Sequence, residues 1–167
     1  FDAPTHIPAY RWVSILNSRL PPAIVVRYAT AVSADWHAQF SAIWRRYRYL
    51  IYTEQWPNVF VQPFVWHYYR HPLNVELMRQ CLHRLLGFHN LEAFRRSGSK
   101  RSHSWIDVQD VVCIQEDPFI RIEIQANGFL YGMVRLLTGL LVDVGRGHLS
   151  PQAFTDIWQH QQRQRVK

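Results

Sequence analysis

Two neighbouring segments of the sequence carry apolar residues at different spacings, and this change constrains the fold more than any other feature. In FIRIEIQANG (119–128), Ile120, Ile122 and Ile124 alternate with polar residues, which is the pattern of a β-strand with one buried face. In FLYGMVRLLTGLLVDVG (129–145), apolar residues recur every three or four positions, which predicts an amphipathic helix that ends at Gly145. A strand followed directly by such a helix favours a fold in which helices pack on a sheet.

Three further segments have the features of helices. Residues 8–22 predict a short helix that ends at a pair of prolines, and residues 74–87 predict a longer one that stops at Gly87. Residues 150–164 begin with a serine in the N-cap position followed by a proline, as helices commonly do.

Strand patterns occupy other parts of the chain. Residues 23–32, 43–52 and 105–117 predict strands, the last paired with 119–128 across a turn at Asp117-Pro118. Three prolines predict little regular structure over 54–72. Because strands and helices are mixed without strict β-α-β alternation, we expect an α+β fold with a mostly antiparallel sheet flanked by helices.

The charge balance points to an anionic partner. The 167 residues include 19 Lys and Arg against 12 Asp and Glu, which gives a net charge of +7. Nucleic acid is one such partner, although a basic surface without a specific partner remains an alternative. No apolar run is long enough for a bilayer and no signal peptide is indicated, so no membrane association is expected. Two distant cysteines, Cys81 and Cys113, suit a reducing cytoplasm.

The strand predicted at 43–52 mixes arginines and tyrosines on both of its faces. A tyrosine beside guanidinium groups can stack on a nucleobase while the cations meet phosphates, which makes Arg45, Arg46 and Arg48 candidate RNA contacts. The tyrosine can also transfer a proton if its surroundings shift its pKa. The alternative is a structural strand with buried rings and arginines that reach out to solvent.

A lone arginine and a basic loop are two more candidates. Arg135 lies opposite the apolar stripe of its helix between Gly132 and Gly139, which suggests that something approaches that face closely; tight packing with Arg135 at the rim is the alternative. The loop RRSGSKRS (95–102) has the composition of a phosphate-contacting loop or of a solvated charge run. Its cations are Arg95, Arg96, Lys100 and Arg101.

Several classes of enzyme lack support in the sequence. There is no G-x-S-x-G nucleophile motif, no P-loop and no G-x-G-x-x-G. His67 and His71 are four residues apart, but the surrounding prolines disfavour a helix and no Cys or carboxylate completes a ligand set. We therefore expect no metal site, and the residues give no support to a nucleotide or dinucleotide site.

Four stretches, taken in order, resemble the motifs of one enzyme family. WHAQFSAIWRRYRYLIY (36–52) resembles F-H-A-R-F-S-A…R-Y-R-Y-x-I-Y, and LLGFHNLEAFRRSGS (85–99) resembles L-L-G-x-H-(D/N)-F-x-x-F. IEIQANGFLYGMVRLLTGLLVDVG (122–145) resembles a strand followed by A-N-x-F-(L/V)-x-x-M-V-R, and LNSRLPPAIVV (16–26) resembles N-x-x-L-P-x-x-(I/V). These are motifs of the TruA family of tRNA pseudouridine synthases, and the similarity covers nearly all of the chain.

The resemblance implies an activity and a fold. Members of the family isomerise uridine to pseudouridine in the anticodon stem-loop of tRNA, without a cofactor or metal. A catalytic aspartate in a G-R-T-D-x-G-V-H motif is essential, and the target base is flipped into a cleft between two similar α+β halves. Members act as homodimers with a basic groove for tRNA. The implied partners are therefore tRNA, through its anticodon arm, and a second copy of the chain.

Two residues of the family's active site have matches here. Tyr47, the first tyrosine of RRYRY, matches the tyrosine expected to stack on the flipped base and to assist removal of the proton from C5. Arg135, in MVR, matches the arginine that pairs with the catalytic aspartate and keeps it ionised. A bare helix face at the two flanking glycines would let Arg135 reach that carboxylate.

The sequence also departs from the family pattern. G-R-T-D-x-G-V-H does not occur, and neither does the family's C-terminal G-L-x-L strand. We therefore expect residues 1–34 to be a remnant of the N-terminal half, residues 35–167 to form the C-terminal half, and the chain alone to be inactive. None of its seven aspartates is a candidate nucleophile. Leu91 replaces a frequent Phe, and Tyr131-Gly132 replaces a frequent His-His. A non-catalytic RNA-binding module derived from the same fold is the alternative.

Overall fold

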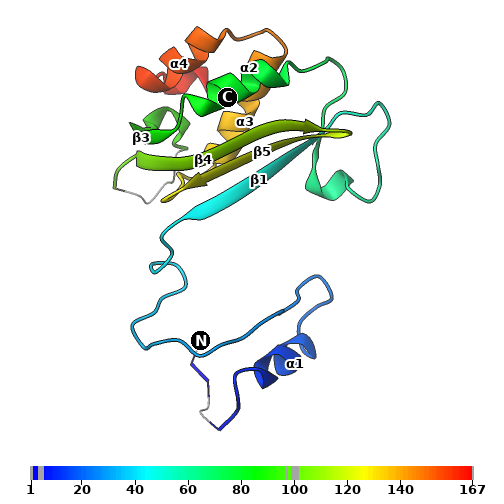
Figure 1. Ribbon diagram of the computed structural model, residues 1–167, viewed down its shortest axis with the longest axis vertical. Helices are drawn as coiled ribbons and strands as arrows, with labels where there is room; N and C mark the ends of the chain where they lie inside the picture. The colour runs from blue at the N-terminus through cyan, green and yellow to red at the C-terminus, as the bar shows by residue number, and fades with distance from the viewer. Residues whose placement is uncertain (1, 4–5, 97, 99–101, 167) are drawn as a thin grey trace. The chain divides into compact units, whose positions relative to one another are not determined.

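The computed structural model describes residues 2–3, 6–96, 98 and 102–166, which fall into two units (Figure 1). The first unit is Phe1–Ala42 and the second is Ile43–Lys167. Helix α1 (Arg11–Asn17) belongs to the first unit, and the strands that the structure describes belong to the second. The predicted division at 34/35 into parts of two similar halves stays a prediction.

The first unit contains a helix but not the strand predicted at 23–32. α1 is shorter than the predicted segment 8–22, and residues 23–32 have no strand structure. The side-chain amide of Asn17 donates to the carbonyl of Val26 at 2.8 Å and its oxygen accepts from the N–H of Val26 at 2.7 Å. A strand needs a neighbouring strand for its backbone groups, and among the described residues of this unit there is none. The strand prediction is therefore wrong.

The second unit is built on a five-stranded sheet in the order β2-β1-β5-β4-β3. The strands are β1 (Arg45–Tyr52), β2 (Trp66–His67), β3 (Gly87–Asn90), β4 (Trp105–Glu116) and β5 (Phe119–Ala126). β2 runs parallel to β1 and pairs only with Ile51 and Tyr52, whereas the other neighbouring strands are antiparallel. The predicted α+β fold with a mostly antiparallel sheet is confirmed.

A β-bulge in β4 keeps its apolar side chains on one face of the sheet. Val108 pairs with Ala126 and Asp110 pairs with Gln125, so that β4 has one more residue than β5 at this point. The extra residue, Gln109, changes the phase of the alternation. As a result, Ile106 and Val108 before the bulge and Val111 and Cys113 after it are all buried.

Helices cover one face of this sheet (Figure 1). They are α2 (Val75–His83), α3 (Met133–Gly145) and α4 (Pro151–Gln159), with three 3-10 turns, η1 (Gln62–Phe64), η2 (Glu92–Phe94) and η3 (Arg163–Arg165). The hydrophobic core lies between the helices and the sheet. It includes Ile120, Ile122 and Ile124 of β5, Met78 and Leu82 of α2, and Leu137 and Leu141 of α3.

Local chemistry sets where the helices begin. Ser150 accepts from the N–H of Ala153 at 3.1 Å, which confirms the predicted N-cap of α4. α3 begins at Met133 rather than Phe129, because Gly132 has φ +73° and cannot belong to a right-handed helix.

Two further glycines lie at or beyond the ends of helices. At the other end of α3, a Cβ on Gly145 would lie 2.7 Å from Sδ of Met78, so a larger residue there would have to displace this buried side chain of α2. α2 ends at His83, before the predicted stop, and Gly87 with φ +101° instead opens β3.

We expect Ile122→Ala to lower the free energy of unfolding of this chain by about 2–5 kcal/mol, because it removes a side chain with 1% exposure from the central strand. Ile43→Ala, which shortens a side chain with 79% exposure, is the matched control and should change it by less than about 0.5 kcal/mol. Denaturant unfolding followed by tryptophan fluorescence measures both. Equal losses would show that β5 is not at the centre of the core.

Candidate active site

Tyr47 lies on the helix-facing side of β1 but remains accessible to solvent. It shares this side of the strand with Tyr49 and the fully buried Ile51, yet it is 49% exposed. Its ring contacts Phe129 edge to face, with ring centroids 4.8 Å apart. Phe129 belongs to the loop that leads into α3. The tyrosine thus contacts Phe129 on one side and is about half exposed to solvent.

Arg135 lies in the first turn of α3 and is exposed. Phe129, four residues before α3, contacts Tyr47, so the segment that leads into this helix lies beside Tyr47. Within the described part of the chain, no carboxylate forms an ion pair with Arg135, and no hydrogen bond joins Arg135 to Tyr47. Phe129 is the group that the structure brings to Tyr47, and sequence reasoning did not single it out.

The two glycines near Arg135, Gly132 and Gly139, are explained by different structural features. Gly132 precedes the helix and has a positive φ, so it is not the interior helical glycine that the sequence suggested. A Cβ at Gly139, by contrast, would meet no described atom within 4 Å. Gly139 lines an open pocket of about 560 Å³ together with Trp66, Tyr68 and Arg146. The helix face at Gly139 is therefore bare, and the alternative of tight packing there is not supported.

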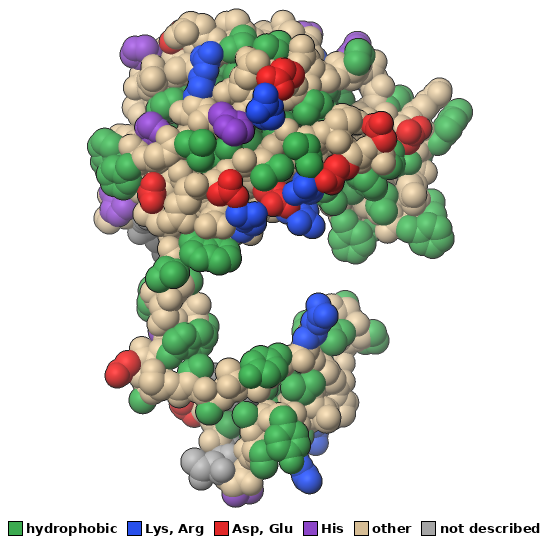
Figure 2. Space-filling view, viewed as in Figure 1, with side chains coloured by type: hydrophobic (Ala, Val, Ile, Leu, Met, Phe, Trp, Pro, Cys, Tyr) green, Lys and Arg blue, Asp and Glu red, His purple; other side chains and the backbone are tan. Residues whose placement is uncertain are grey.

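The opposite face of the sheet carries a network of ion pairs centred on Glu123 of β5. This carboxylate is only 4% exposed. Its Oε1 accepts from Nε of Arg48 at 2.7 Å and from Nη1 of Arg121 at 2.8 Å, and its Oε2 accepts from Nη1 of Arg46 at 3.3 Å. Arg46 also pairs with Asp110. Figure 2 shows acidic and basic side chains side by side along this part of the second unit.

The network controls the protonation of its members. Burial alone would raise the pKa of Glu123, but hydrogen bonds and charge from Arg48 and Arg121 outweigh it and lower that pKa below its ordinary value of 4.5. Arg121 also donates two hydrogen bonds to Glu116, at 2.8 and 2.9 Å, and these bonds lower the pKa of Glu116. Glu123 is thus ionised at neutral pH, and it balances charge from arginines that the sequence had suggested as RNA contacts.

The other candidate RNA contacts lie in separate places. Arg45 is half-buried on the same side of β1 as Tyr47, and Arg95 pairs with Glu92 at 3.5 Å. Arg96 is exposed, and its side chain lies against Gly132. Lys100 and Arg101 lie outside the described residues.

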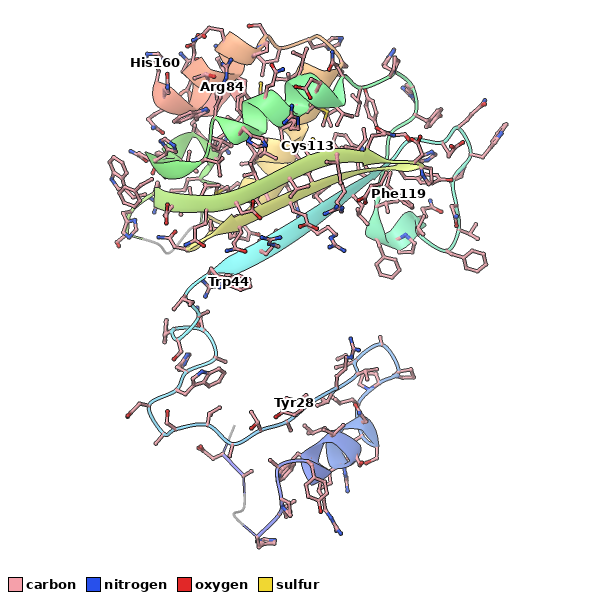
Figure 3. All side chains as sticks on the ribbon, viewed as in Figure 1. Tyr28, Trp44, Arg84, Cys113, Phe119 and His160 are labelled. Carbon is pink, nitrogen blue, oxygen red and sulfur yellow. The ribbon has the colours of Figure 1, made fainter. Side chains whose placement is uncertain are left out.

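Thiol and metal chemistry find no support in the described residues. Both cysteines are buried and unpaired, and burial raises the pKa of Cys113 to about 12, which disfavours the nucleophilic thiolate. Figure 3 shows Cys113 between the sheet and the helices. Among the residues that the structure describes, no group of three His, Cys, Asp or Glu side chains could hold a metal ion. No helix in this part of the chain is long and apolar enough to cross a bilayer.

The surroundings of Tyr47 suit base stacking and proton transfer. A tyrosine that is held by Phe129 and open to solvent can stack on a planar ligand and exchange a proton with it. Arg135, exposed in the first turn of α3, can stabilise a carboxylate that approaches from another segment. Neither group alone supplies a nucleophile.

Comparisons of the chain with a family model and with known proteins agree with one another. A model of the tRNA pseudouridine synthase family matches residues 82–167. Proteins named tRNA pseudouridine synthase A from Rippkaea orientalis and from a Picosynechococcus species are 60% and 59% identical over the whole chain. The one from Thermosynechococcus vestitus is 57% identical over 96% of it. The chain spans only 57 to 61% of the length of these relatives.

We expect Glu123→Gln to lower the free energy of unfolding by about 1–3 kcal/mol at neutral pH, because three arginines lose their shared buried anion. Since folding lowers the pKa of Glu123, its contribution is fully present above pH 4.5 and is lost as the pH falls below that value. Denaturant unfolding of wild type and variant from pH 7 to pH 3 should therefore show two curves that converge. A constant difference would exclude the charge as its cause.

Proposed function

The chain belongs to the tRNA pseudouridine synthase family, and from this premise we propose that the protein isomerises uridine to pseudouridine in the anticodon stem-loop of tRNA. One observation carries the proposal. An accessible tyrosine, Tyr47, is held by Phe129 beside the start of α3, where Arg135 has no acidic partner among the described residues. Base stacking, proton transfer and the binding of a carboxylate are the three tasks that these groups suit.

The proposed reaction balances without any other reactant. The C1′–N1 glycosidic bond of the uridine breaks, the uracil turns, and a bond forms between C1′ and C5. C5 loses its proton and N1 ends with one, so the product is an isomer of the substrate. In this scheme Tyr47 stacks on the flipped base and assists the removal of the C5 proton. Arg135 holds a catalytic aspartate in its ionised form.

That aspartate is proposed to come from a segment outside residues 1–167. None of the seven aspartates of the chain lies in the G-R-T-D-x-G-V-H motif that the family resemblance implies. The relatives are also considerably longer than the chain. In this proposal Arg135 is exposed because its partner belongs to that other segment.

The substrate and setting are further parts of the proposal. The net charge of +7 supports an RNA partner, and the arginines at positions 45, 46, 48, 95, 96 and 101, with Lys100, are its proposed contacts. Arg46 and Arg48 would contact RNA while they also pair with Glu123. Two reduced, buried cysteines support action in the cytoplasm.

A homodimer is also proposed. Its support is a group of exposed apolar side chains that one chain leaves uncovered: Trp56, Val59, Phe60 and Phe64. Sedimentation of the full-length protein over a range of concentrations tests it. A monomer at micromolar concentration would reject the dimer.

A non-catalytic RNA-binding module is the second candidate, and the missing aspartate motif favours it. The two candidates differ in one measurement. Incubating tRNA labelled with tritium at C5 of uridine with the full-length protein should release tritium to water if the enzyme proposal holds. Binding of the tRNA without release would support the binding module instead.

We expect Tyr47→Phe in the full-length protein to reduce the rate of tritium release at least about 100-fold, because the variant keeps the ring but loses the group that transfers the proton. The Kd for tRNA should change less than about twofold. Tyr69→Phe, which changes another exposed tyrosine, is the control and should keep full activity. Equal losses of rate and affinity would remove Tyr47 from the proton transfer.

We expect Arg135→Ala to reduce the rate more than Arg135→Lys, because lysine keeps the positive charge but loses the two-point contact of a guanidinium with a carboxylate. In addition, Arg135→Ala should raise the pH at which activity appears, since the aspartate loses its cation and its pKa rises. Rate against pH from 4 to 9 tests this. An alanine variant with full activity would exclude Arg135 from the site.

A further inference from the structure

The side chain of Arg96 occupies the space in which residue 132 would have its own side chain. A Cβ on Gly132 would stand 2.5 Å from Cδ of Arg96 and 3.2 Å from its Cγ. Gly132 also has φ +73°, a conformation that glycine adopts without strain. Two independent constraints, backbone conformation and the stem of Arg96, therefore act on the same residue.

This arrangement places the stem of Arg96 beside Gly132. Gly132 stands three residues after Phe129, which contacts Tyr47, and three residues before Arg135. An arginine whose stem lies on Gly132 therefore has its charged end at the start of α3, between these two groups along the chain. A stem that already lies beside Gly132 loses less side-chain entropy when the charged end binds a ligand.

Most arginines of this unit have a partner, whereas Arg96 has none among the residues that the structure describes. Arg46, Arg48 and Arg121 share Glu123, Arg79 pairs with Glu76, and Arg146 pairs with Asp143. Within the described residues, Arg96 is exposed and has neither an ion pair nor a hydrogen bond. Its charge is therefore available to an anion from outside the described chain.

We propose that Arg96, seated on Gly132, is a substrate-positioning residue that binds the phosphodiester next to the target uridine. The proposal rests on the proposed function and makes it more specific: Arg96 holds the backbone of the nucleotide, whereas Tyr47 contacts its base. A flipped nucleotide needs such a hold, because its phosphates move with the base and lose their regular duplex geometry. Gly132 has the role of keeping Arg96 in place.

The test compares four forms of the full-length protein with an unmodified tRNA transcript as substrate: wild type, Arg96→Ala, Arg96→Lys and Gly132→Asn. Asparagine tolerates a positive φ but carries a Cβ, so it displaces the arginine stem without breaking the turn. We expect Arg96→Ala to raise KM about tenfold with kcat within about twofold, and to reduce the slope of log Kd against log salt by about one. Arg96→Lys should recover most of this loss, and Gly132→Asn should match Arg96→Ala.

Two comparisons separate positioning from folding. Adding Gly132→Asn to Arg96→Ala should raise KM no further, since the two changes remove the same contact. Arg70→Ala is the matched control. Arg70 is also exposed and without an ion pair or hydrogen bond to the described residues, but it lies in the 54–72 segment, so this change should leave KM unchanged. The thermal midpoint of Arg96→Ala should stay within about 2 °C of wild type.

Failure of this inference can be told from failure of the proposed function. If wild type forms pseudouridine but Arg96→Ala keeps both the wild-type KM and the wild-type salt slope, the positioning role is wrong. A further rise of KM when Gly132→Asn is added to Arg96→Ala would also overturn it, because Gly132 would then act through the start of α3. If wild type binds the transcript but forms no pseudouridine, the proposed function fails while the salt slope still reports on Arg96.

Discussion

The antiparallel pairing of β1 with β5 is the constraint on which the rest of the second unit depends. Its register sets Tyr47 opposite Ile124 and Arg48 opposite Glu123. On one face, the isoleucines of β5 meet the helices and close the core. On the other face, the same strand offers Glu123 to the arginines of β1. A shift of one residue would place Glu123 in the core and the isoleucines in solvent, so only this register satisfies both sides.

The difference between the two faces of the sheet explains why neither face of β1 has a purely apolar sequence pattern. The segment 43–52 mixes cations and phenols because its two faces have different neighbours. Arg46 and Arg48 meet carboxylates across the strand, whereas Tyr47 and Tyr49 face the helices. Tyr47 lies far enough from the centre of the core to stay half exposed. Position along the strand, as well as the face, thus decides which tyrosine can meet a ligand.

Sequence patterns predicted the elements that rely on periodicity. The strands at 105–116 and 119–126 and the helices α2, α3 and α4 follow from apolar spacing and capping residues. Residues 23–32 have strand-like composition but no strand to pair with, a condition that composition does not report. The start of α3 depends on the φ of Gly132, which a helical pattern of side chains cannot show.

The candidate site was predicted in part. The family resemblance pointed to Tyr47 and Arg135, whereas the contact of Phe129 with Tyr47 and the seat of Arg96 on Gly132 required three-dimensional information. Glu123 was missed because the alternation around it drew attention to the isoleucines. A lone glutamate among them, opposite an arginine in an expected antiparallel pair, was the available signal. The sequence gives the net charge of the chain, but the ion pairs in the structure are needed to tell which arginines lack an acidic partner.

The short pairing of β1 with β2 has a consequence for how the chain behaves in solution. β2 covers only Ile51 and Tyr52, so in the described structure the remaining length of β1 has hydrogen-bonding groups along an open edge. Open edges recruit strands from other molecules, and charged side chains are a common defence against this. Arg46 and Arg48 stand on that edge with part of their charge already balanced by Glu123. Added salt screens the charges of these arginines, so the isolated chain should resist aggregation less well at high ionic strength.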